Sequence, residues 1–224
     1  MKTVGISIRL LAHASVQIRT DTQNIYIDPT TKGTGLKKGD FSPADLILVT
    51  HGHQDHFDKG LIKKIRKLGS PVIAPAGVKK DLGSIVWDMA PGQRMEISDG
   101  PVIWATEAYN VKRFRSPGEP FHPRGLGVGF IIKLGETKIY HAGDTDLIPE
   151  MEKLPELDVA LLPSGGTYTM DMKEAAEAAL LIKPKVAIPM HCKNLDPEEF
   201  KEIVKAESSV EVVILSQGEE YILE

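Results

Sequence analysis

The chain has 224 residues, of which 42% are hydrophobic and 26% are charged, and its formal net charge is -4. This composition is that of an ordinary globular protein, and it excludes a disordered or low-complexity chain. The acidic balance argues against a nucleic-acid-binding surface, which would normally show a basic excess. We expect a single domain over residues 1–224, because neither half shifts in composition and the length suits one core.

The sequence lacks the features of a secreted or membrane-bound protein. Its first residues do not form the apolar core of a signal peptide, and no apolar run approaches the roughly 18 residues of a membrane span. The single cysteine, Cys192, excludes an internal disulfide and fits a reducing compartment. We therefore expect a soluble, cytoplasmic protein without membrane contact, and we leave open whether it forms a homo-oligomer.

Alternating apolar residues predict an antiparallel meander at the start of the chain. Strands are expected over residues 3–11, 15–19 and 25–29, with turn residues between them. His13 lies between the first two strands, and Asp28 lies in the third. We interpret His13 as structural with metal ligation as the alternative, and Asp28 as a turn residue with support of a ligand as the alternative.

The densest group of chemically active residues lies in residues 46–58. An apolar run from Leu46 to Thr50 predicts a buried strand, and the next eight positions contain three histidines and two aspartates: His51, His53, Asp55, His56 and Asp58. His51 and His53 are two residues apart on extended backbone, so they project to the same side and can bind one cation. Imidazole and carboxylate groups suit zinc, manganese or iron. We therefore predict a metal site, and the alternative is a plain polar loop before the next helix.

The following segment predicts a strand–helix–strand unit. A short helix with an apolar face from Leu61 to Leu68 precedes a strand over residues 71–75, which implies that the strands on either side of it pair in parallel. Further strands are expected over residues 94–97 and 102–106. Residues 111–126 then form a loop that is longer than most connections.

The later strands end in further candidate ligands. Strands are expected over 127–134, 137–141, 158–163 and 185–190, with helices over 172–182 and from Asp196 onward, and closing strands over 210–215 and 221–223. The strand over 137–141 runs into Asp144, and the strand over 185–190 ends at His191. Because strand ends hold side chains rigidly while loops leave positions open, these residues fit one catalytic cleft.

This order of elements favours an α/β (α+β) fold. A strand-rich first part with one crossover helix is followed by a second strand-rich part with two helices. Because antiparallel hairpins predominate, two sheets packed face to face with helices outside, a four-layer αββα sandwich, suit this order better than one doubly wound sheet.

Three motifs, each after a hydrophobic strand, carry a resemblance to a known family. His-Gly-His-Gln-Asp-His at 51–56, Gly-Asp-Thr at 143–145 and Pro-Met-His at 189–191 resemble the metallo-β-lactamase fold superfamily of metal-dependent hydrolases, over nearly the whole chain. Ile-Asp-Pro at 27–29 and His-Ala-Gly-Asp-Thr-Asp at 141–146 are similar to the small hydrolases grouped with ascorbate-6-phosphate lactonase.

The resemblance implies a binuclear centre of two divalent ions, with zinc expected first and manganese or iron as alternatives. It assigns His51 and His53 to the first ion and Asp55, His56 and His191 to the second. Asp144 would bridge them, because a carboxylate has two oxygens for two ions.

The chain departs from the family pattern at one position. The family normally has a further histidine after the strand over 102–106, but here Tyr109 and Asn110 occupy that place, and His122 lies twelve residues beyond Asn110. We expect His122 to fold back and supply the missing imidazole. The alternative is that Asn110 occupies this position and leaves the first ion weakly held.

The implied reaction is hydrolysis of a small ester, lactone or phosphoester. Two divalent ions would lower the pKa of a bridging water from 15.7 to about 7, and the resulting hydroxide would attack the substrate. Asp55 would orient the nucleophile or accept its proton. Asn110 and Arg124, together with Lys193, are candidates for binding the substrate, and Tyr168 and Thr169 are candidates for lining the pocket.

Two other functions remain open. The first is a nuclease or phosphodiesterase of the same superfamily, against which the acidic charge argues. The second is a metal-binding sensor without turnover, which the departure at Asn110 suggests. Cys192 is expected to be small core packing rather than a ligand.

Overall fold

The computed structural model describes residues 5–193 and 195–223. The chain separates into two compact units, one formed by residues 1–89 with 215–224 and the other by residues 90–214, and each is described by itself. Among the described residues, no helix combines the length and the apolar character needed to cross a membrane. The single domain over residues 1–224 stays a prediction.

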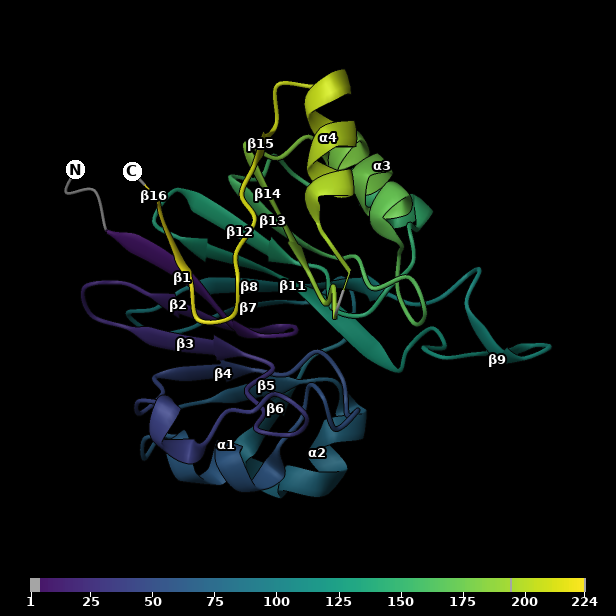
Figure 1. Ribbon diagram of the computed structural model, residues 1–224. Coiled ribbons are helices and arrows are strands. Elements are labelled where there is room, and N and C mark those ends of the chain that lie inside the picture. The colour runs from purple at the N-terminus through teal and green to yellow at the C-terminus, as the bar shows by residue number, and fades with distance from the viewer. Residues whose placement is uncertain (1–4, 194, 224) are drawn as a thin grey trace. The chain divides into compact units, whose positions relative to one another are not determined.

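The first unit contains a seven-stranded mixed sheet (Figure 1). Its spatial order is β16-β1-β2-β3-β4-β5-β6, antiparallel from β16 to β3 and parallel from β3 to β6. The strands are β1 (Ile6–Ala12), β2 (Ser15–Arg19), β3 (Asn24–Ile27), β4 (Leu46–Leu48), β5 (Val72–Ala74), β6 (Val86–Asp88) and β16 (Glu220–Leu223). The expected meander and the parallel pairing of the strands on either side of the crossover helix are both confirmed; residues 3 and 4 of the first expected strand lie outside the described residues.

Short helices cover one face of this sheet: α1 (Lys59–Ile65), α2 (Ala76–Leu82) and the 3-10 turns η1 (Lys38–Asp40) and η2 (Gly83–Ile85). Asp58 caps α1, because its carboxylate accepts a hydrogen bond from Leu61 N. Leu61, Ile62 and Ile65 pack into one apolar cluster with Ile47 and Val72 of the sheet. Full burial of each of these aliphatic side chains contributes about 1.5–3 kcal/mol to folding.

The helix α1 is shorter than its apolar pattern predicts. Arg66 adopts an extended conformation and bridges to Ala44, which ends the helix at Ile65. Leu68 is therefore fully exposed instead of extending the buried face. The prediction for Leu68 was wrong because a tertiary strand contact overrides the local helical pattern.

The second unit contains another seven-stranded mixed sheet, with the order β15-β14-β13-β12-β11-β8-β7. The strands are β7 (Arg94–Glu96), β8 (Val102–Ala108), β11 (Gly127–Leu134), β12 (Thr137–His141), β13 (Val159–Pro163), β14 (Val186–Met190) and β15 (Glu211–Val212). From β12 to β15 the pairing is parallel, so these strands bring their carboxyl ends to one edge of the sheet.

Helices α3 (Met172–Ile182) and α4 (Glu198–Glu207) pack beside this sheet, and the 3-10 turn η3 (Pro149–Lys153) precedes β13. Asp171 and Glu174 form a reciprocal capping box that starts α3. The α3 face is rich in alanine, which lets Phe200 and Val204 of α4 approach closely. Pro197, rather than Asp196, occupies the cap position of α4, although the Asp196 carboxylate still accepts a hydrogen bond from Glu198 N.

The long loop over residues 111–126 has local structure that the sequence pattern did not predict. It forms a small antiparallel hairpin, β9 (Phe114–Ser116) and β10 (Glu119–Pro120), with Gly118 at φ 81° in the turn. Figure 1 shows this hairpin extending away from the sheet of its unit. Two-stranded hairpins are marginally stable alone, so the segment depends on contacts at its base.

Candidate metal centre

In the first unit, neighbouring parallel strands bring Asp28 and His51 together. β3 and β4 pair with Ile27 opposite Leu48, so the residues that follow these strands lie side by side. Asp28 is fully buried, and its carboxylate accepts hydrogen bonds from Thr50 N at 2.7 Å, Thr50 Oγ1 at 2.6 Å and His56 Nδ1 at 2.7 Å. Asp28 thus contacts His56, one of the predicted ligands, and its support of a ligand stays a prediction.

These contacts set which ring nitrogen carries the proton. Thr50 Oγ1 donates its only proton to Asp28, so it can only accept from His51 Nδ1 at 3.0 Å. His56 likewise donates from Nδ1 to Asp28. Both imidazoles therefore keep the lone pair on Nε2, which is the form of histidine that binds a metal ion.

The other candidate ligands of this unit lie next to these rings. His51 Nε2 is 3.0 Å from His53 Nδ1, and the ring centres of His51 and His56 are 4.2 Å apart. His13 Nε2 is 3.4 Å from the Asp55 carboxylate, and His13, Asp55 and His56 each offer a ligand atom within 4.8 Å of the others. The first unit thus gathers four imidazoles and one carboxylate.

In the second unit, Asp144 lies between two histidines. Its Oδ2 is 3.3 Å from His122 Nε2 and 3.3 Å from His191 Nε2. Asp144 follows β12, His191 follows β14, and His122 comes from the long loop, and all three are nearly fully buried. The structure thus brings His122, and not Asn110, to the Asp144 carboxylate.

Asn110 lies behind His122 and fixes its orientation. Asn110 Oδ1 accepts hydrogen bonds from His122 N at 2.8 Å and from His122 Nδ1 at 2.9 Å, so His122 Nε2 keeps the lone pair. Asn110 Nδ2 donates to Asp146 Oδ1 at 3.1 Å and to Tyr168 O at 2.9 Å, which determines the orientation of the amide. Both amide atoms are therefore engaged within the unit, and substrate binding by Asn110 stays a prediction.

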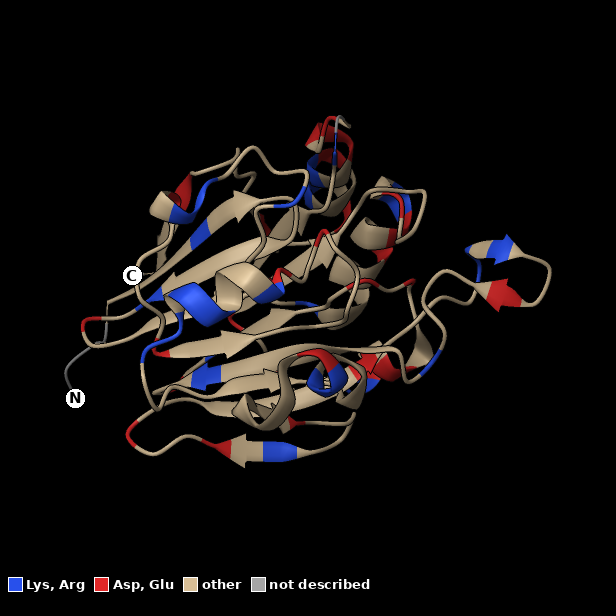
Figure 2. Cartoon of the chain, turned by 90° about the horizontal axis from the view of Figure 1, so that it is seen from below, with Lys and Arg blue, Asp and Glu red and all other residues tan. Residues whose placement is uncertain are grey.

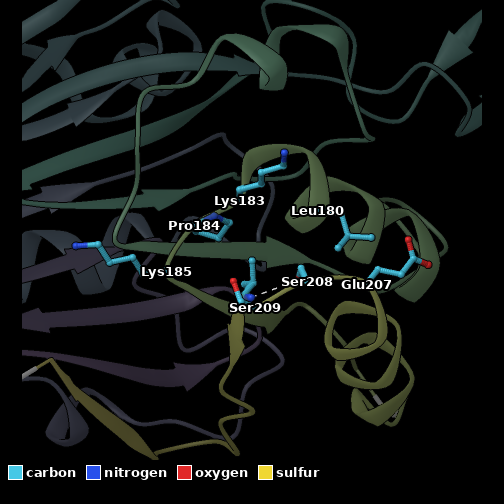
Figure 3. Close-up of a pocket in the computed structure, with 8 residues that line it drawn as sticks. Leu180, Lys183, Pro184, Lys185, Glu207, Ser208 and Ser209 are labelled. Carbon is cyan, nitrogen blue, oxygen red and sulfur yellow. Dashed lines mark hydrogen bonds between the residues drawn. The ribbon is translucent and has the colours of Figure 1, made fainter.

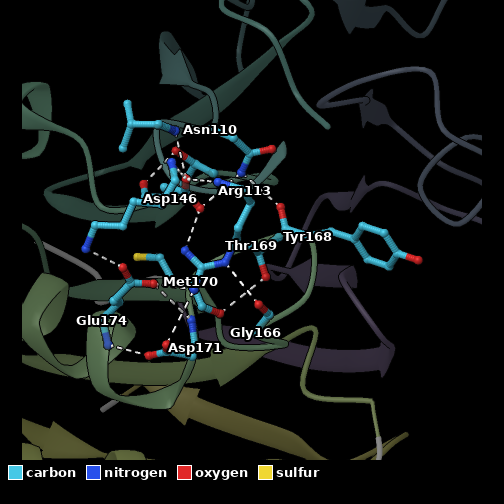
Figure 4. A network of polar contacts seen from close by, with 12 residues as sticks. Asn110, Arg113, Asp146, Gly166, Tyr168, Thr169, Met170, Asp171 and Glu174 are labelled. Carbon is cyan, nitrogen blue, oxygen red and sulfur yellow. Dashed lines mark hydrogen bonds and ion pairs between the residues drawn. The ribbon is translucent and has the colours of Figure 1, made fainter. Parts of the chain in front are cut away.

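Behind Asn110, Asp146 and Arg113 form the centre of a polar network (Figure 4). Asp146 is fully buried and accepts hydrogen bonds from Val111 N, Lys112 N and Arg113 Nη1 at 2.7–2.8 Å. Arg113 also pairs with Glu174 and donates to Gly166 O. Burial disfavours the charge on Arg113, but Glu174 and Asp146 outweigh this effect, and its pKa is raised. The network ties the base of the hairpin to the start of α3.

Glu174 gives this network a measurable pH dependence. Burial alone would raise its pKa, but hydrogen bonds from Arg113 and Lys112 lower it below the ordinary value of 4.5. The ionised carboxyl therefore stabilises the fold above that value, and the contribution is lost as the pH falls through the folded-state pKa. We expect Glu174→Gln to lower the free energy of unfolding by about 1.5–3 kcal/mol at pH 7. Urea unfolding at pH 7 and below pH 4 checks this prediction: the difference from the wild type must shrink in acid, and a difference independent of pH contradicts it.

Gly165 makes room for His191. A Cβ at position 165 would lie 2.5 Å from the His191 carbonyl oxygen and 2.9 Å from His191 Nδ1, which is closer than real Cβ atoms come. His191 itself adopts a left-handed conformation with φ 58°. His13 (φ 53°) and Asp28 (φ 49°) share this conformation, which costs a non-glycine residue about 1–3 kcal/mol. Such strain persists where the surrounding structure holds a residue in a functional position.

Two other predicted residues have ordinary surroundings. Arg124 is exposed, pairs with Glu107 at 2.7 Å and Glu150 at 2.6 Å, and stacks on Tyr109, so substrate binding by Arg124 stays a prediction. Cys192 packs against the apolar cluster of the second unit, and burial raises the pKa of its thiol to about 12. The thiol donates a hydrogen bond to Met190 O at 3.5 Å, and its position against the apolar cluster agrees with the expected packing role.

A surface hollow of about 590 Å³ lies elsewhere in the second unit (Figure 3). It is formed by the ends of α3 and α4 and the start of β14, and Leu180, Lys183, Pro184 and Ser208 are among its lining residues. None of the predicted site residues lines it. We therefore do not assign the chemistry to this hollow.

The donor sets fit a divalent metal ion. Imidazole nitrogens with fixed tautomers and carboxylate oxygens are the ligands that zinc, manganese and iron accept. The Asp144 carboxylate, 3.3 Å from the Nε2 atoms of His122 and His191, adds an oxygen donor beside two nitrogen donors. The sequence pattern missed three supporting residues, Asp146, Arg113 and Gly165, because none is itself a ligand.

Comparison with known proteins places this arrangement in a family. The profile of the β-lactamase superfamily domain matches residues 7–191. A UPF0173 metal-dependent hydrolase of Pyrococcus furiosus is 38% identical, with 96% of this chain and 98% of the relative covered. A similar hydrolase of Methanopyrus kandleri is 37% identical over 96% of this chain and 98% of its own length.

Solved structures agree with these relatives. A protein of Parabacteroides distasonis assigned as a metal-dependent hydrolase has a TM-score of 0.86 and 32% identity, covering 93% of this chain and 92% of its own. Igni18, a metallo hydrolase of Ignicoccus hospitalis, has a TM-score of 0.79 and 29% identity, covering 98% and 99%. The predicted fold class is confirmed, and so is the resemblance to the superfamily.

Proposed function

Because this chain belongs to the β-lactamase superfamily and is a metal-dependent hydrolase, we propose that it hydrolyses a small ester, lactone or phosphoester with two divalent metal ions. The observation that carries the proposal is the Asp144 carboxylate, 3.3 Å from the Nε2 atoms of His122 and His191. A buried carboxylate is costly unless it is paired, and a cation held between Asp144 and these two imidazoles would supply that pairing.

We assign the ligands as the resemblance implies, with His122 completing the set. His51, His53 and His122 would hold the first ion, and Asp55, His56 and His191 the second, with Asp144 shared. The hydrogen bonds from Thr50, Asp28 and Asn110 support this assignment, because they leave Nε2 of His51, His56 and His122 as the ligand atom. Zinc is our first expectation, and manganese and iron accept the same donors.

When bound, the ions would activate water and polarise the carbonyl or phosphoryl group of the substrate. The residues of the chain supply the remaining functions. Asp28 and Asn110 hold imidazole rings in one tautomer. Asp55 would accept a proton from the attacking water, and its half-exposed carboxylate beside His13 supports this role.

The test of this proposal measures metal content and hydrolysis together. The protein is stripped with a chelator, reloaded with zinc, manganese or iron, and assayed with 4-nitrophenyl acetate, a small lactone and bis(4-nitrophenyl) phosphate. We expect two ions per chain and hydrolysis that disappears in the stripped protein. Tight binding without turnover of any substrate would favour the metal-binding sensor, and activity confined to the phosphodiester would favour the nuclease or phosphodiesterase.

Asp55 provides a second test. Asp55→Asn keeps the size of the side chain but removes the basic carboxylate, so we expect turnover to fall by about 10²-fold with the fold preserved. Circular dichroism and the thermal midpoint serve as controls for folding. Unchanged hydrolysis would contradict the role of Asp55.

We also propose a cytoplasmic location, on the basis of the single cysteine, and a small molecule rather than nucleic acid as the partner. In the view of Figure 2, basic and acidic segments are interspersed along the described chain, and the formal net charge of -4 argues against a broad phosphate-binding surface. Homo-oligomer formation remains part of the proposal and is tested by sedimentation.

A further inference from the structure

A group of aromatic and basic side chains in the second unit has no part in the ligand network. The Phe121 and Tyr168 rings meet edge to face with centres 4.8 Å apart. Lys193 Nζ lies 4.3 Å from the Tyr168 ring centre, and the Arg115 guanidinium lies 5.8 Å from that of Phe121. Three separate segments, the hairpin, the loop after β13 and the segment after His191, converge here.

Each of these segments also carries a ligand or its support. Phe121 directly precedes His122, and Lys193 follows His191 by two residues. The Tyr168 carbonyl accepts a hydrogen bond from Asn110, the residue that orients His122. Figure 4 shows the Tyr168 ring turned away from the polar network. The aromatic pair is therefore adjacent in sequence to one candidate ligand, His122, and shares the Asn110 contact through the Tyr168 carbonyl.

The basic residues of this group differ from their basic neighbours in having no ion-pair partner among the described residues. Lys112, Arg113 and Arg124 each pair with at least one carboxylate. In the described part of the chain, by contrast, no carboxylate forms an ion pair with Arg115 or Lys193, and both are exposed. Tyr168 is 37% exposed, so part of its side chain is accessible to solvent. The Lys193 ammonium, which lies over the Tyr168 ring without a carboxylate partner among the described residues, suits a ligand that carries a negative charge, and the partly exposed ring beside it suits a planar apolar group.

We infer that Phe121, Tyr168 and Lys193 form the substrate-binding surface of this hydrolase, and that its substrate carries a planar apolar group with one negative charge, such as a carboxylate. The inference rests on the proposed function and narrows it. The rings would contact the planar group, and Lys193 would contact the charge. Lys193 is a point charge without a fixed fork of donors, which fits a single anionic group.

A matched pair of esters tests the charge. Phenyl acetate and 4-acetoxybenzoate share the same ester bond, but only the second carries a carboxylate. We expect Lys193→Gln to raise KM for 4-acetoxybenzoate about tenfold, with KM for phenyl acetate and kcat for both esters unchanged. Lys173→Gln, which removes an exposed charge on α3, is the control. It should change neither KM nor kcat for either ester. If Lys193→Gln and the wild type have the same KM for 4-acetoxybenzoate, the inference is overturned.

The aromatic part is tested by Tyr168→Leu. This variant keeps an apolar side chain and the backbone carbonyl that Asn110 contacts, so we expect metal content to stay intact while KM rises for both phenyl esters and stays constant for ethyl acetate. Equal KM changes for all three esters would overturn the assignment of Tyr168.

A binding measurement separates this inference from the proposed function. Calorimetry of benzoate against benzamide, on the metal-loaded protein and its Lys193→Gln variant, needs no turnover. Binding of benzoate that depends on Lys193, in a protein that hydrolyses nothing, would refute the proposed function and support this surface. Hydrolysis with no difference in KM between charged and neutral esters would support the proposed function and refute the assignment of this surface.

Discussion

Replacement of Asp146 by asparagine is expected to lower the free energy of unfolding by about 3–5 kcal/mol and to weaken metal binding. Asp146 is fully buried and compensates the charge of Arg113. Removing its charge leaves Arg113 with Glu174 and Asp171 as its ion-pair partners. It also brings a new amide donor toward the backbone N–H groups of Val111 and Lys112, where only an acceptor fits.

The effect should reach the ligands through Asn110. Asp146 Oδ1 accepts from Asn110 Nδ2, and this contact helps to keep Asn110 Oδ1 directed at His122 Nδ1. If the Asn110 amide turns, His122 loses the acceptor that fixes its tautomer. Loss of such a supporting contact lowers metal affinity by about 10–100-fold.

Two measurements separate stability from metal binding. Urea unfolding of the metal-free protein gives the first, and competition with a chromophoric chelator gives the second. Asp158→Asn is the control, because Asp158 pairs with the exposed Lys185 at 2.7 Å and contacts no predicted ligand. A loss below about 1 kcal/mol for Asp146→Asn, comparable to that of an exposed pair, would show that the network does not support the fold.

The second large effect is expected from Gly165→Ala, which adds a single methyl group. Gly165→Ala would place Cβ 2.5 Å from the His191 carbonyl and 2.9 Å from its ring nitrogen, so the backbone or the ring must move. Both close contacts are with His191, so we expect the relaxation to shift its ring relative to Asp144. Because displacement by about 1 Å at a reacting centre costs about 10²-fold, we expect turnover to fall by at least that factor and metal content to drop below that of the wild type.

Gly77→Ala is the matched control for Gly165→Ala. Gly77 lies in α2, where a Cβ meets no atom within 4 Å and alanine favours the helix. The visible spectrum of the cobalt-loaded protein reports the ligand set directly. A spectrum and a metal content for Gly165→Ala equal to those of the wild type would mean that His191 is not a ligand.

Much of the fold, and most of the candidate ligands, could be predicted from contiguous sequence. The segment 46–58 joins an apolar strand to closely spaced histidines, so strand, loop and chemistry are all visible in thirteen residues. His122 could be predicted only through the family pattern, because this chain lacks the family's histidine near Asn110. His122 lies beside Asp144 only because the loop over residues 111–126 folds back, and no local sequence pattern predicts that course.

The supporting residues could not be predicted because their roles arise from tertiary contacts. Asp146 follows Asp144 by two residues and resembles another ligand, yet its carboxylate faces Asn110 and Arg113. Gly165 is a glycine in a glycine-rich loop, and only the carbonyl of His191, twenty-six residues later, shows why alanine does not fit. The early end of α1 has the same origin, since the bridge between Ala44 and Arg66 competes with the helix.

The pairing of β16 with β1 has a consequence for biosynthesis. Residues Ile6 and Leu223 are partners in the first sheet, so a growing polypeptide can close the second sheet before it closes the first. A truncation after residue 214 would keep every candidate ligand. It would nevertheless leave the backbone N–H and C=O groups of β1 open along one edge, where another chain can pair with them. We therefore expect β16 to lower the tendency to aggregate, because it covers this edge, although it contributes no candidate ligand.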